Sequence, residues 1–244
     1  MRVLITGATS GIGEKLAELC ESKGLQTILT GRHIDKLARF KGEKIACDLA
    51  ADRTPLLEAI RSQAPDIIIS NAGFGLYGEA LSLSFQEQLE MVEVNSKALL
   101  EITLEGAKAL RALGKGGVIL NIASAAAFQP FPNFAVYSAT KAFVLSLSQS
   151  LDGELADHGI RVLVSCPGRV ATDFSSRASK EPRQASPDKM TTEFAAQEIW
   201  RQIERKKRVH IFDGKYRLLI RIGQFFIPNR WLGPYLKKTL DKKR

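Results

Sequence analysis

Tyr137 and Lys141 are the two residues of this sequence best suited to acid–base chemistry. They stand four positions apart in a stretch that predicts a helix, so both side chains lie on one helical face. A phenol with an ordinary pKa of about 10 transfers protons poorly at neutral pH, but a neighbouring ammonium favours the phenolate and lowers that pKa. Ser124 follows a predicted strand and can hold a carbonyl or hydroxyl oxygen beside the phenol. The three residues predict proton exchange with such an oxygen.

The Tyr-x-x-x-Lys spacing needs support from elsewhere in the chain. Such a pair occurs often by chance in helices, where a solvent-exposed face carrying Tyr and Lys is the ordinary explanation. The interpretation of Tyr137 and Lys141 as reacting groups therefore depends on further motifs that could bring a reaction partner to them.

A glycine-rich turn follows the first predicted strand and opens a predicted helix. Glycines permit a tight turn and a close approach of the backbone to a pyrophosphate at a helix N-terminus. The spacing is Gly-x-x-x-Gly-x-Gly rather than the commoner Gly-x-Gly-x-x-Gly, and a plain strand–helix connection would also use glycines. As a dinucleotide site, the turn would bind through Gly7, Thr9, Ser10, Gly11, Ile12 and Gly13.

The end of the second predicted strand bears on the choice of dinucleotide. An enzyme that uses NAD places an acid about 20 residues past the glycines, where it holds the ribose hydroxyls. Here that acid is missing, and Gly31 and Arg32 follow Thr30 instead. A guanidinium suits a 2′-phosphate, so the sequence favours NADP(H), although an exposed Arg after a strand is also an ordinary surface feature.

Two further clusters follow strands and could line an adenine and ribose site. Asp48 and Leu49 come after the third predicted strand, and Asn71, Ala72 and Gly73 come after the fourth. In open α/β sheets the binding crevice lies at these carboxyl ends. Each cluster taken alone could be a simple turn.

The elements that must position these residues alternate along the chain. Short β-rich runs predict seven parallel strands, at residues 3–6, 27–30, 44–47, 66–70, 118–122, 161–165 and 209–212. Predicted helices begin near residues 11, 35, 52, 84, 133 and 192. Strand–helix alternation packs helices on both faces of a parallel sheet, so we expect a Rossmann-type, doubly wound α/β fold.

The composition excludes several classes of protein. A chain of 244 residues with 45% hydrophobic content can bury the core of one α/β domain. Its three cysteines lack the spacing of a zinc site or a disulfide framework, so no metal is expected. Residues 200–244 hold 14 Lys and Arg against 3 Asp and Glu, so the net charge of +9 belongs to the tail and does not indicate a nucleic-acid partner.

The sequence also bears on location. No segment reaches the roughly 18 uncharged apolar residues that a membrane-spanning helix needs. The first predicted strand begins directly after Met1 and leaves no room for a signal sequence, so we expect a cytoplasmic protein.

Two predicted helices, residues 84–113 and 133–157, are apolar over most of their circumference and should be buried on more than one side. A second subunit could cover the outer side, which predicts a homodimer or homotetramer, but a folded C-terminal segment would hide the same surface. Residues 172–189 are polar and aperiodic and predict a mobile lid over the substrate.

Taken together, the motifs resemble those of the classical short-chain dehydrogenase/reductase family across residues 1 to about 212. The resemblance rests on the glycine turn, Asn71-Ala72-Gly73, Asn95, Ser124, Tyr137, Lys141 and Pro167-Gly168, which occur in this order. It implies a catalytic set in which Asn95 helps to hold a water on the proton path. It also implies that Tyr137 and Lys141 contact the cofactor and that its nicotinamide side is lined by Pro167, Gly168, Val170 and Thr172.

The sequence departs from the family pattern at two positions. Ser70 stands where the family usually has an Asn before Asn71, and Ser10 stands where many NADP-using members carry a basic residue. The second departure leaves Arg32 as the main determinant of cofactor choice.

The C-terminal extension, residues 213–244, mixes large apolar residues with Lys and Arg. Such a pattern can pack on the domain of residues 1–212 as a cover for the substrate pocket, or it can lie in an anionic membrane interface as a peripheral contact. The sequence leaves both alternatives open.

The motifs together predict an NADPH-dependent oxidoreductase that acts on a carbonyl or secondary alcohol, with Tyr137 as general acid and base. Phe128, Phe131 and Phe134 indicate an apolar small-molecule substrate. The alternative is a sensor or scaffold that binds NADP(H) without turnover, because a fold alone does not establish catalysis.

Overall fold

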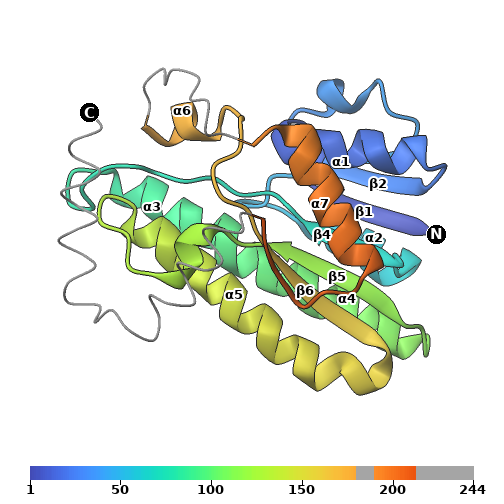
Figure 1. The fold of residues 1–244 in the computed structure, drawn as a ribbon. Helices are drawn as coiled ribbons and strands as arrows, with labels where there is room; N and C mark the ends of the chain where they lie inside the picture. Colours follow the sequence, from blue (N-terminus) through green and yellow to red (C-terminus); the bar gives the residue numbers. More distant parts are fainter. Residues whose placement is uncertain (180–189, 213–244) are drawn as a thin grey trace.

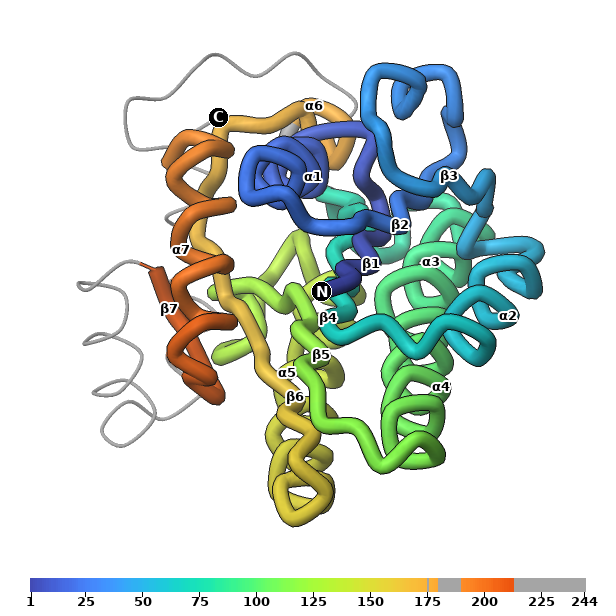
Figure 2. The backbone as a smooth tube through the Cα atoms, turned by 90° about the vertical axis from the view of Figure 1, so that its right-hand side faces the viewer, coloured from blue at the N-terminus to red at the C-terminus, as the bar shows by residue number. Residues whose placement is uncertain are grey.

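The computed structural model describes residues 1–179 and 190–212. Its strands form one parallel sheet in the order β3-β2-β1-β4-β5-β6-β7, with β3 and β7 at the two edges (Figure 2). The strands are β1 (Arg2–Thr6), β2 (Gln26–Gly31), β3 (Glu43–Ala46), β4 (Ile67–Ser70), β5 (Gly117–Ile122), β6 (Ile160–Cys166) and β7 (Val209–Ile211). The predicted seven-stranded parallel sheet is confirmed.

Helices cover both faces of this sheet, as expected for a doubly wound fold (Figure 1). Helices α1 and α7 pack on one face, and α2, α4 and α5 pack on the other. The α-helices are α1 (Gly11–Ser22), α2 (Thr54–Gln63), α3 (Phe85–Val92), α4 (Leu99–Ala112), α5 (Ala135–Leu155), α6 (Phe174–Ser179) and α7 (Thr192–Glu204). Shorter turns are η1 (Ile34–Leu37), η2 (Glu93–Ala98), η3 (Ala125–Phe128) and η4 (Ala156–His158).

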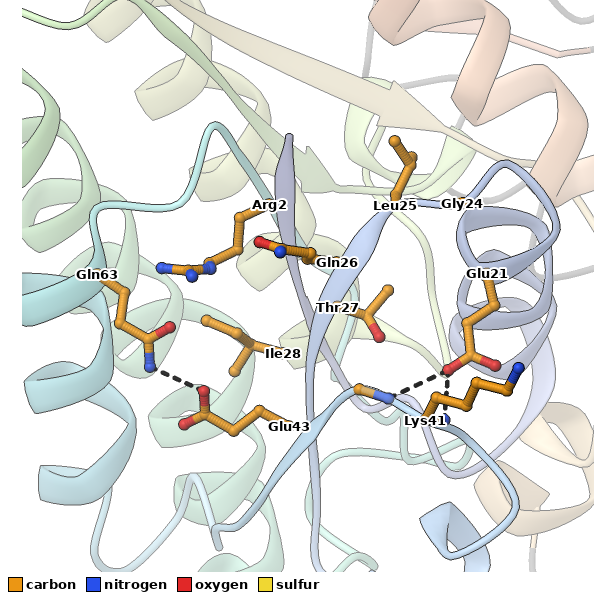
Figure 3. Close-up of a pocket in the computed structure, with 11 residues that line it drawn as sticks. Arg2, Glu21, Gly24, Leu25, Gln26, Thr27, Ile28, Lys41, Glu43 and Gln63 are labelled. Atoms are coloured by element: carbon orange, nitrogen blue, oxygen red, sulfur yellow. Dashed lines mark hydrogen bonds between the residues drawn. The ribbon is translucent and has the colours of Figure 1, made fainter.

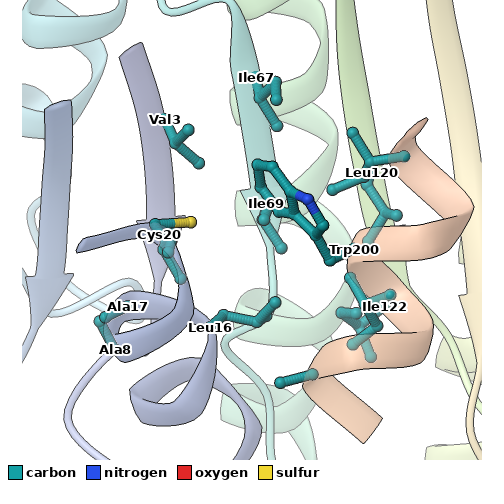
Figure 4. Packing of buried hydrophobic residues seen from close by; sticks show 14 of the residues in the cluster. Val3, Ala8, Leu16, Ala17, Cys20, Ile67, Ile69, Leu120, Ile122 and Trp200 are labelled. Atoms are coloured by element: carbon teal, nitrogen blue, oxygen red, sulfur yellow. The ribbon is translucent and has the colours of Figure 1, made fainter. Parts of the chain in front are cut away.

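The alternation of side chains along the strands divides the core into two layers. In β1, Val3 and Ile5 pack toward α1 and α7, whereas Leu4 packs toward α2 and α4. Figure 4 shows the first layer, in which Trp200 of α7 lies against the strands and Leu16 of α1. Apolar residues on both faces of a central strand explain why its sequence is a continuous hydrophobic run.

A buried polar chain fixes α5 relative to the sheet. Asn121 of β5 is fully buried; its Oδ1 accepts from Thr103 Oγ1 of α4 at 3.2 Å, and its Nδ2 donates to Ser148 Oγ of α5 at 3.0 Å. Ser148 Oγ donates in turn to Val144 O. Because these groups satisfy one another away from water, they define how α5 lies against β5, and α5 carries Tyr137 and Lys141.

The structure differs from the sequence prediction in three elements. The helix expected over residues 84–113 is interrupted by η2, a π-helical turn that separates α3 from α4. The helix expected near residue 35 is only the 3₁₀ turn η1. The first part of the predicted lid forms the short helix α6, and residues 180–189 lie outside the described residues.

Several large apolar side chains of α3 and α5 are exposed. Phe85, Leu89 and Val92 of α3 are 75%, 46% and 41% exposed, and Phe143 of α5 is 40% exposed. The sequence predicts a second subunit or the C-terminal extension over these helices, and the extension lies outside the described residues. Within residues 1–179 and 190–212, no helix has the length and apolar character required to cross a membrane.

Candidate active site

The predicted site residues gather at the carboxyl edge of the sheet, around the point where the strand order changes direction between β1 and β4. Thr6 at the end of β1 joins the two strands there. Its Oγ1 accepts from the backbone N–H groups of Asn71 and Ala72, each at 3.0 Å. The Asn71 side chain donates to the carbonyls of Thr6 at 3.0 Å and Gly7 at 3.3 Å. The Asn71 side chain therefore fixes the start of the glycine turn by hydrogen bonds.

The glycine turn packs closely against neighbouring segments of the protein. Gly7 and Gly11 have φ values of +66° and +59°, which favour glycine. A Cβ at Gly13 would lie 2.3 Å from the Gly7 carbonyl oxygen and 2.5 Å from Asn71 Nδ2. Helix α1 therefore packs against the turn at a distance that only glycine permits.

The N-terminus of α1 lies at this turn. Ser10 is the N-cap, and its side chain makes no capping hydrogen bond. The first backbone N–H groups of a helix lack partners inside the helix, and they carry a partial positive charge. Such N–H groups can bind the oxygens of a pyrophosphate. The sequence predicts this contact for Thr9, Ser10, Gly11, Ile12 and Gly13, and it stays a prediction.

The end of β2 is closed to a side chain at residue 31. A Cβ at Gly31 would lie 2.5 Å from Thr9 Cγ2, so Thr9 fills the space in which an acidic side chain would begin. Arg32 is exposed at the next position. Asp48 is exposed after β3, and its carboxylate accepts from Ala50 N at 3.0 Å. This arrangement leaves a cation, not an acid, at the end of β2.

Ser124, Tyr137 and Lys141 lie together beyond the end of β5. Ser124 is the N-cap of η3, and its Oγ accepts from Ala126 N at 3.1 Å. Tyr137 and Lys141 are only 6% and 4% exposed, and Lys141 Nζ lies 5.8 Å from the centroid of the Tyr137 ring. Lys141 Nζ donates to the Ile122 carbonyl at 2.9 Å.

Burial controls the protonation of this pair. Burial raises the pKa of the Tyr137 phenol to about 12, and a hydrogen bond with Ser124 lowers it by a smaller amount. Burial lowers the pKa of the Lys141 ammonium to about 8. The expected lowering of the Tyr137 pKa by Lys141 is therefore not what the structure shows, because removal of the phenolate from water has the larger effect.

Asn95 lies in η2, and its side chain links three parts of the site. It is fully buried, and its Oδ1 accepts from Phe74 N at 3.1 Å. Its Nδ2 donates to Phe74 O at 2.8 Å and to Thr140 Oγ1 at 3.2 Å. Thr140 Oγ1 donates to the Tyr137 carbonyl at 2.7 Å. Asn95 therefore connects the loop after β4 to the helix of Tyr137.

Thr140 was missed by the sequence analysis, although it lies inside the Tyr-x-x-x-Lys motif. Nothing in its type distinguishes it from other Thr residues in a helix. Its hydrogen bond with Asn95 depends on the packing of η2 against α5, which the sequence does not show.

The loop after β6 reaches back to the glycine turn. Pro167 O accepts from Ala125 N at 2.9 Å, beside Ser124, and Val170 pairs with Met190 in an isolated bridge. A Cβ at Gly11 would lie 3.1 Å from Thr172 Cγ2. The predicted pyrophosphate and nicotinamide segments therefore lie next to each other.

Aromatic side chains cover the Tyr137 ring. Its centroid lies 4.4 Å from that of Phe134 and 5.4 Å from that of Phe174, and Phe134 also contacts Tyr77 and Phe131. A Cβ at Gly75 would lie 2.9 Å from Phe174 and 3.0 Å from Phe134. Tyr77 and Phe174 were not predicted, because only the tertiary fold brings them to Tyr137.

A second concave surface lies at the amino ends of β1 and β2, at the opposite edge of the sheet (Figure 3). This groove of about 440 Å³ contains none of the predicted site residues. Glu21 accepts from Lys41 N and Gly42 N, and Gln63 donates to Glu43. Among the described residues, no group of His, Cys, Asp and Glu is arranged to hold a metal.

Comparison with known proteins gives consistent matches over this part of the chain. A family model described as short chain dehydrogenase matches residues 1–183. An uncharacterised oxidoreductase of Schizosaccharomyces pombe is 34% identical over 183 residues, which cover 71% of this chain and 62% of that protein. The match therefore spans less than two thirds of the length of that relative.

Two solved structures share the fold over nearly the whole chain. A short-chain dehydrogenase from Sphingobium yanoikuyae, in complex with NADPH, has a TM-score of 0.80 and 28% identity, covering 91% of this chain and 92% of that chain. The bulky-bulky ketone specific alcohol dehydrogenase from Comamonas testosteroni has a TM-score of 0.78 and 27% identity, covering 93% of each chain.

Proposed function

Because this chain belongs to the short-chain dehydrogenase family of oxidoreductases, we propose that it transfers hydride between NADP(H) and a carbonyl compound or a secondary alcohol. The observation that carries this proposal is the group formed by the half-buried Ser124 and the buried Tyr137 and Lys141 at the carboxyl edge of the sheet. The glycine turn, which fits a pyrophosphate, opens onto the same edge. A reaction partner held by the turn would therefore reach these three side chains.

Each side chain has a distinct task in the proposed reduction. Bound NADPH supplies the hydride. Tyr137 donates its phenolic proton to the oxygen that becomes an alcohol. Its raised pKa makes it a weaker acid than a free phenol, but it carries the proton at neutral pH, and the alkoxide that hydride transfer produces is a stronger base than the phenolate. Ser124 holds the same oxygen by a hydrogen bond. In the reverse direction, Tyr137 must first lose its proton before it can accept one from the alcohol.

Lys141 and Asn95 support this proton transfer in the proposal. The Lys141 ammonium stabilises negative charge on Tyr137 once the phenol has given up its proton, and it is available to the nicotinamide ribose. Asn95 fixes the loop after β4 and, through Thr140, the first turn of α5. It is also the residue next to which a water on the proton path is expected.

We propose NADP(H) rather than NAD(H) because of the end of β2. Thr9 fills the space in which an acidic side chain at residue 31 would begin, and Arg32 offers an exposed guanidinium at the next position. A guanidinium binds phosphate oxygens with charge-assisted hydrogen bonds, whereas an acid would repel a 2′-phosphate.

We propose an apolar substrate because aromatic and aliphatic side chains pack around Tyr137. Phe134 and Phe174 contact the Tyr137 ring from two directions, and Leu76 and Met91 are buried in the same cluster. The relative from Comamonas testosteroni is described as specific for bulky-bulky ketones, which supports a carbonyl flanked by large groups. The proposal is tested by offering the protein a series of alkyl and aryl ketones and aldehydes as substrates. The oxidation of NADPH with each compound is followed by its absorbance.

This assay also separates the enzyme from a catalytically silent NADP(H)-binding protein. The enzyme consumes NADPH with at least one member of the series, and replacement of Tyr137 abolishes the reaction. A protein that binds NADPH tightly but turns over none of a broad series would contradict the proposed reaction and favour the sensor or scaffold.

We propose further that the protein is a cytoplasmic homodimer or homotetramer, with the exposed apolar residues of α3 and α5 at a subunit contact. Sedimentation velocity measures the oligomeric state. Sedimentation with anionic liposomes, with and without residues 213–244, tests the alternative that the extension binds a membrane surface.

A further inference from the structure

Arg53 contacts both the loop after β3 and the segment that contains Asn95. It is the N-cap of α2 and is only 8% exposed. A buried guanidinium loses its hydration, and a buried ion pair is often no more stabilising than a well-packed apolar group. A contribution to stability alone therefore does not explain why a guanidinium is buried at this position.

One arm of the guanidinium holds the loop after β3. Arg53 Nη1 donates to the Leu49 carbonyl at 2.7 Å, in a buried hydrogen bond. The Leu49 side chain is 8% exposed and belongs to the same core cluster as Val94 of η2. Asp48 and Leu49 are the residues predicted to line the adenine side of the dinucleotide site, so Arg53 fixes the backbone on which that prediction depends.

The other arm holds the π-helical turn. Arg53 Nη2 donates to Glu93 Oε1 at 2.8 Å, and Glu93 is the first residue of η2. Nε and Nη2 also form a two-pronged contact with Glu101 of α4, at 2.6 and 3.1 Å. One side chain thus joins the loop after β3 to both ends of the segment that contains Asn95.

A π-helical turn is a costly local distortion and needs support from its surroundings. Here Asn95 uses that turn to reach Phe74 and Thr140, and Thr140 contacts the carbonyl of Tyr137. A shift of Glu93 would therefore move the anchor of η2 and, with it, the contacts of Asn95.

We propose that Arg53 is a positioning residue that couples dinucleotide binding at Asp48 and Leu49 to the π-helical turn that holds Asn95. The coupling rests on the proposed function, because it assumes that a nicotinamide dinucleotide binds at the carboxyl edge of the sheet. It adds a route by which the bound cofactor sets the geometry of the proton-transfer groups, through Leu49, Arg53 and Glu93.

The chain provides a matched control for this proposal. Arg61 of α2 donates to Glu105 of α4 at 2.8 Å, so it joins the same two helices two turns further along. Arg61 has no contact with Leu49 or η2 among the described residues. If Arg53 only connected α2 to α4, Arg61 would have the same role. The proposed coupling to the cofactor site belongs to Arg53 alone.

The experiment compares Arg53→Lys with Arg61→Lys in the full chain. NADPH affinity is measured by fluorescence titration, and hydrogen–deuterium exchange of the peptide covering residues 93–98 is measured with and without NADPH. We expect Arg53→Lys to weaken NADPH binding about tenfold, because Lys cannot make the forked contact and reach the Leu49 carbonyl together. We also expect NADPH to slow exchange in η2 of the wild type and of Arg61→Lys, but much less in Arg53→Lys.

Equal affinities and equal protection in the two variants would overturn the coupling, as would an absence of NADPH-induced protection of η2 in the wild type. If Arg53→Lys does not fold, Glu93→Gln serves instead, because it keeps the Leu49 and Glu101 contacts. Its control is Lys97→Gln, which removes the other partner of Glu93, at 3.1 Å. Loss of η2 protection in Glu93→Gln but not in Lys97→Gln is the expected result, and equal protection in both would overturn the coupling.

These outcomes are distinguishable from failure of the proposed function. A wild type that binds NADPH without turnover contradicts the reaction but still reports the coupling through binding and exchange. A wild type that binds neither NADPH nor NADH overturns both.

Discussion

Lys141 donates a hydrogen bond of 2.9 Å to the carbonyl of Ile122, the last residue of β5. This contact directs the ammonium of α5 to the carboxyl edge of the sheet. Burial is the main influence on Lys141 and lowers its pKa to about 8. Lys141 is therefore a cation at neutral pH, and burial of this charge lowers the stability of the folded protein. A buried charge that destabilises the fold is typical of a functional site.

Lys141→Met should make the protein more stable at neutral pH while abolishing turnover. The folded pKa of about 8 lies below the ordinary value of 10.5, so burial of the charged form opposes folding at every pH below 8. We expect a gain of roughly 1–3 kcal/mol in the free energy of unfolding, reduced by the loss of the bond to Ile122. The gain should shrink as pH rises from about 8 to 10.5 and vanish above that range.

Urea unfolding of the wild type and Lys141→Met across this pH range measures the difference. A variant that is less stable than the wild type at every pH would show that Lys141 contributes to folding and that its burial is fully compensated.

The two reaction directions should depend differently on pH. Burial raises the pKa of Tyr137 to about 12, so the phenol keeps its proton through neutral pH and reduction should not require alkaline conditions. Oxidation of an alcohol requires the phenolate, and its rate should rise about tenfold per pH unit while the protonated phenol predominates. Initial rates in both directions with one substrate pair measure this. An oxidation rate that is already constant at neutral pH would contradict the raised pKa.

Tyr137→Phe should retain cofactor binding and lose the reaction. The substitution keeps the ring that packs on Phe134 and Phe174 and removes only the hydroxyl. We expect turnover to fall by about 10²–10⁴, the usual contribution of a general acid, and NADPH affinity to change less than about threefold. Tyr77→Phe is the matched control, because Tyr77 lies at the edge of the same aromatic cluster. Full turnover by Tyr137→Phe would refute the proposed proton donor.

The sequence predicts the parts of this site that depend on local spacing. The strands, the glycine turn and the pairing of Tyr137 with Lys141 follow from periodicity and from residue types near strand ends. The π-helical turn was not predictable, because residues 93–98 contain no Gly or Pro to mark a break. The raised pKa of Tyr137 and its contact with Phe174 depend on burial by segments distant in sequence, which no local pattern reports.

Arg32→Ala should reduce the preference for NADPH over NADH. Arg32 is exposed at the end of β2, and a guanidinium on a phosphate supplies charge-assisted hydrogen bonds, so we expect the preference to fall about 10- to 100-fold. The shift in melting temperature with each nucleotide measures the two affinities. Arg39→Ala is the control, because Arg39 is already paired with Glu14 and Glu18. A wild type stabilised more by NADH than by NADPH would reject the assignment of cofactor.

Gly13→Ala and Gly153→Ala should change stability in opposite directions. Both glycines lie in helices, but a Cβ at Gly13 would lie 2.3 Å from the Gly7 carbonyl oxygen, whereas a Cβ at Gly153 meets no heavy atom within 4 Å. Gly13→Ala must push α1 away from the turn, so we expect a loss of about 2 kcal/mol or more together with weaker NADPH binding. Gly153→Ala should add roughly 0.5–1 kcal/mol, because alanine restricts the unfolded chain and favours a helix. Urea unfolding measures both. If Gly13→Ala were tolerated as well as Gly153→Ala, the close packing of α1 on the turn, and with it the fit to a pyrophosphate, would have to be abandoned.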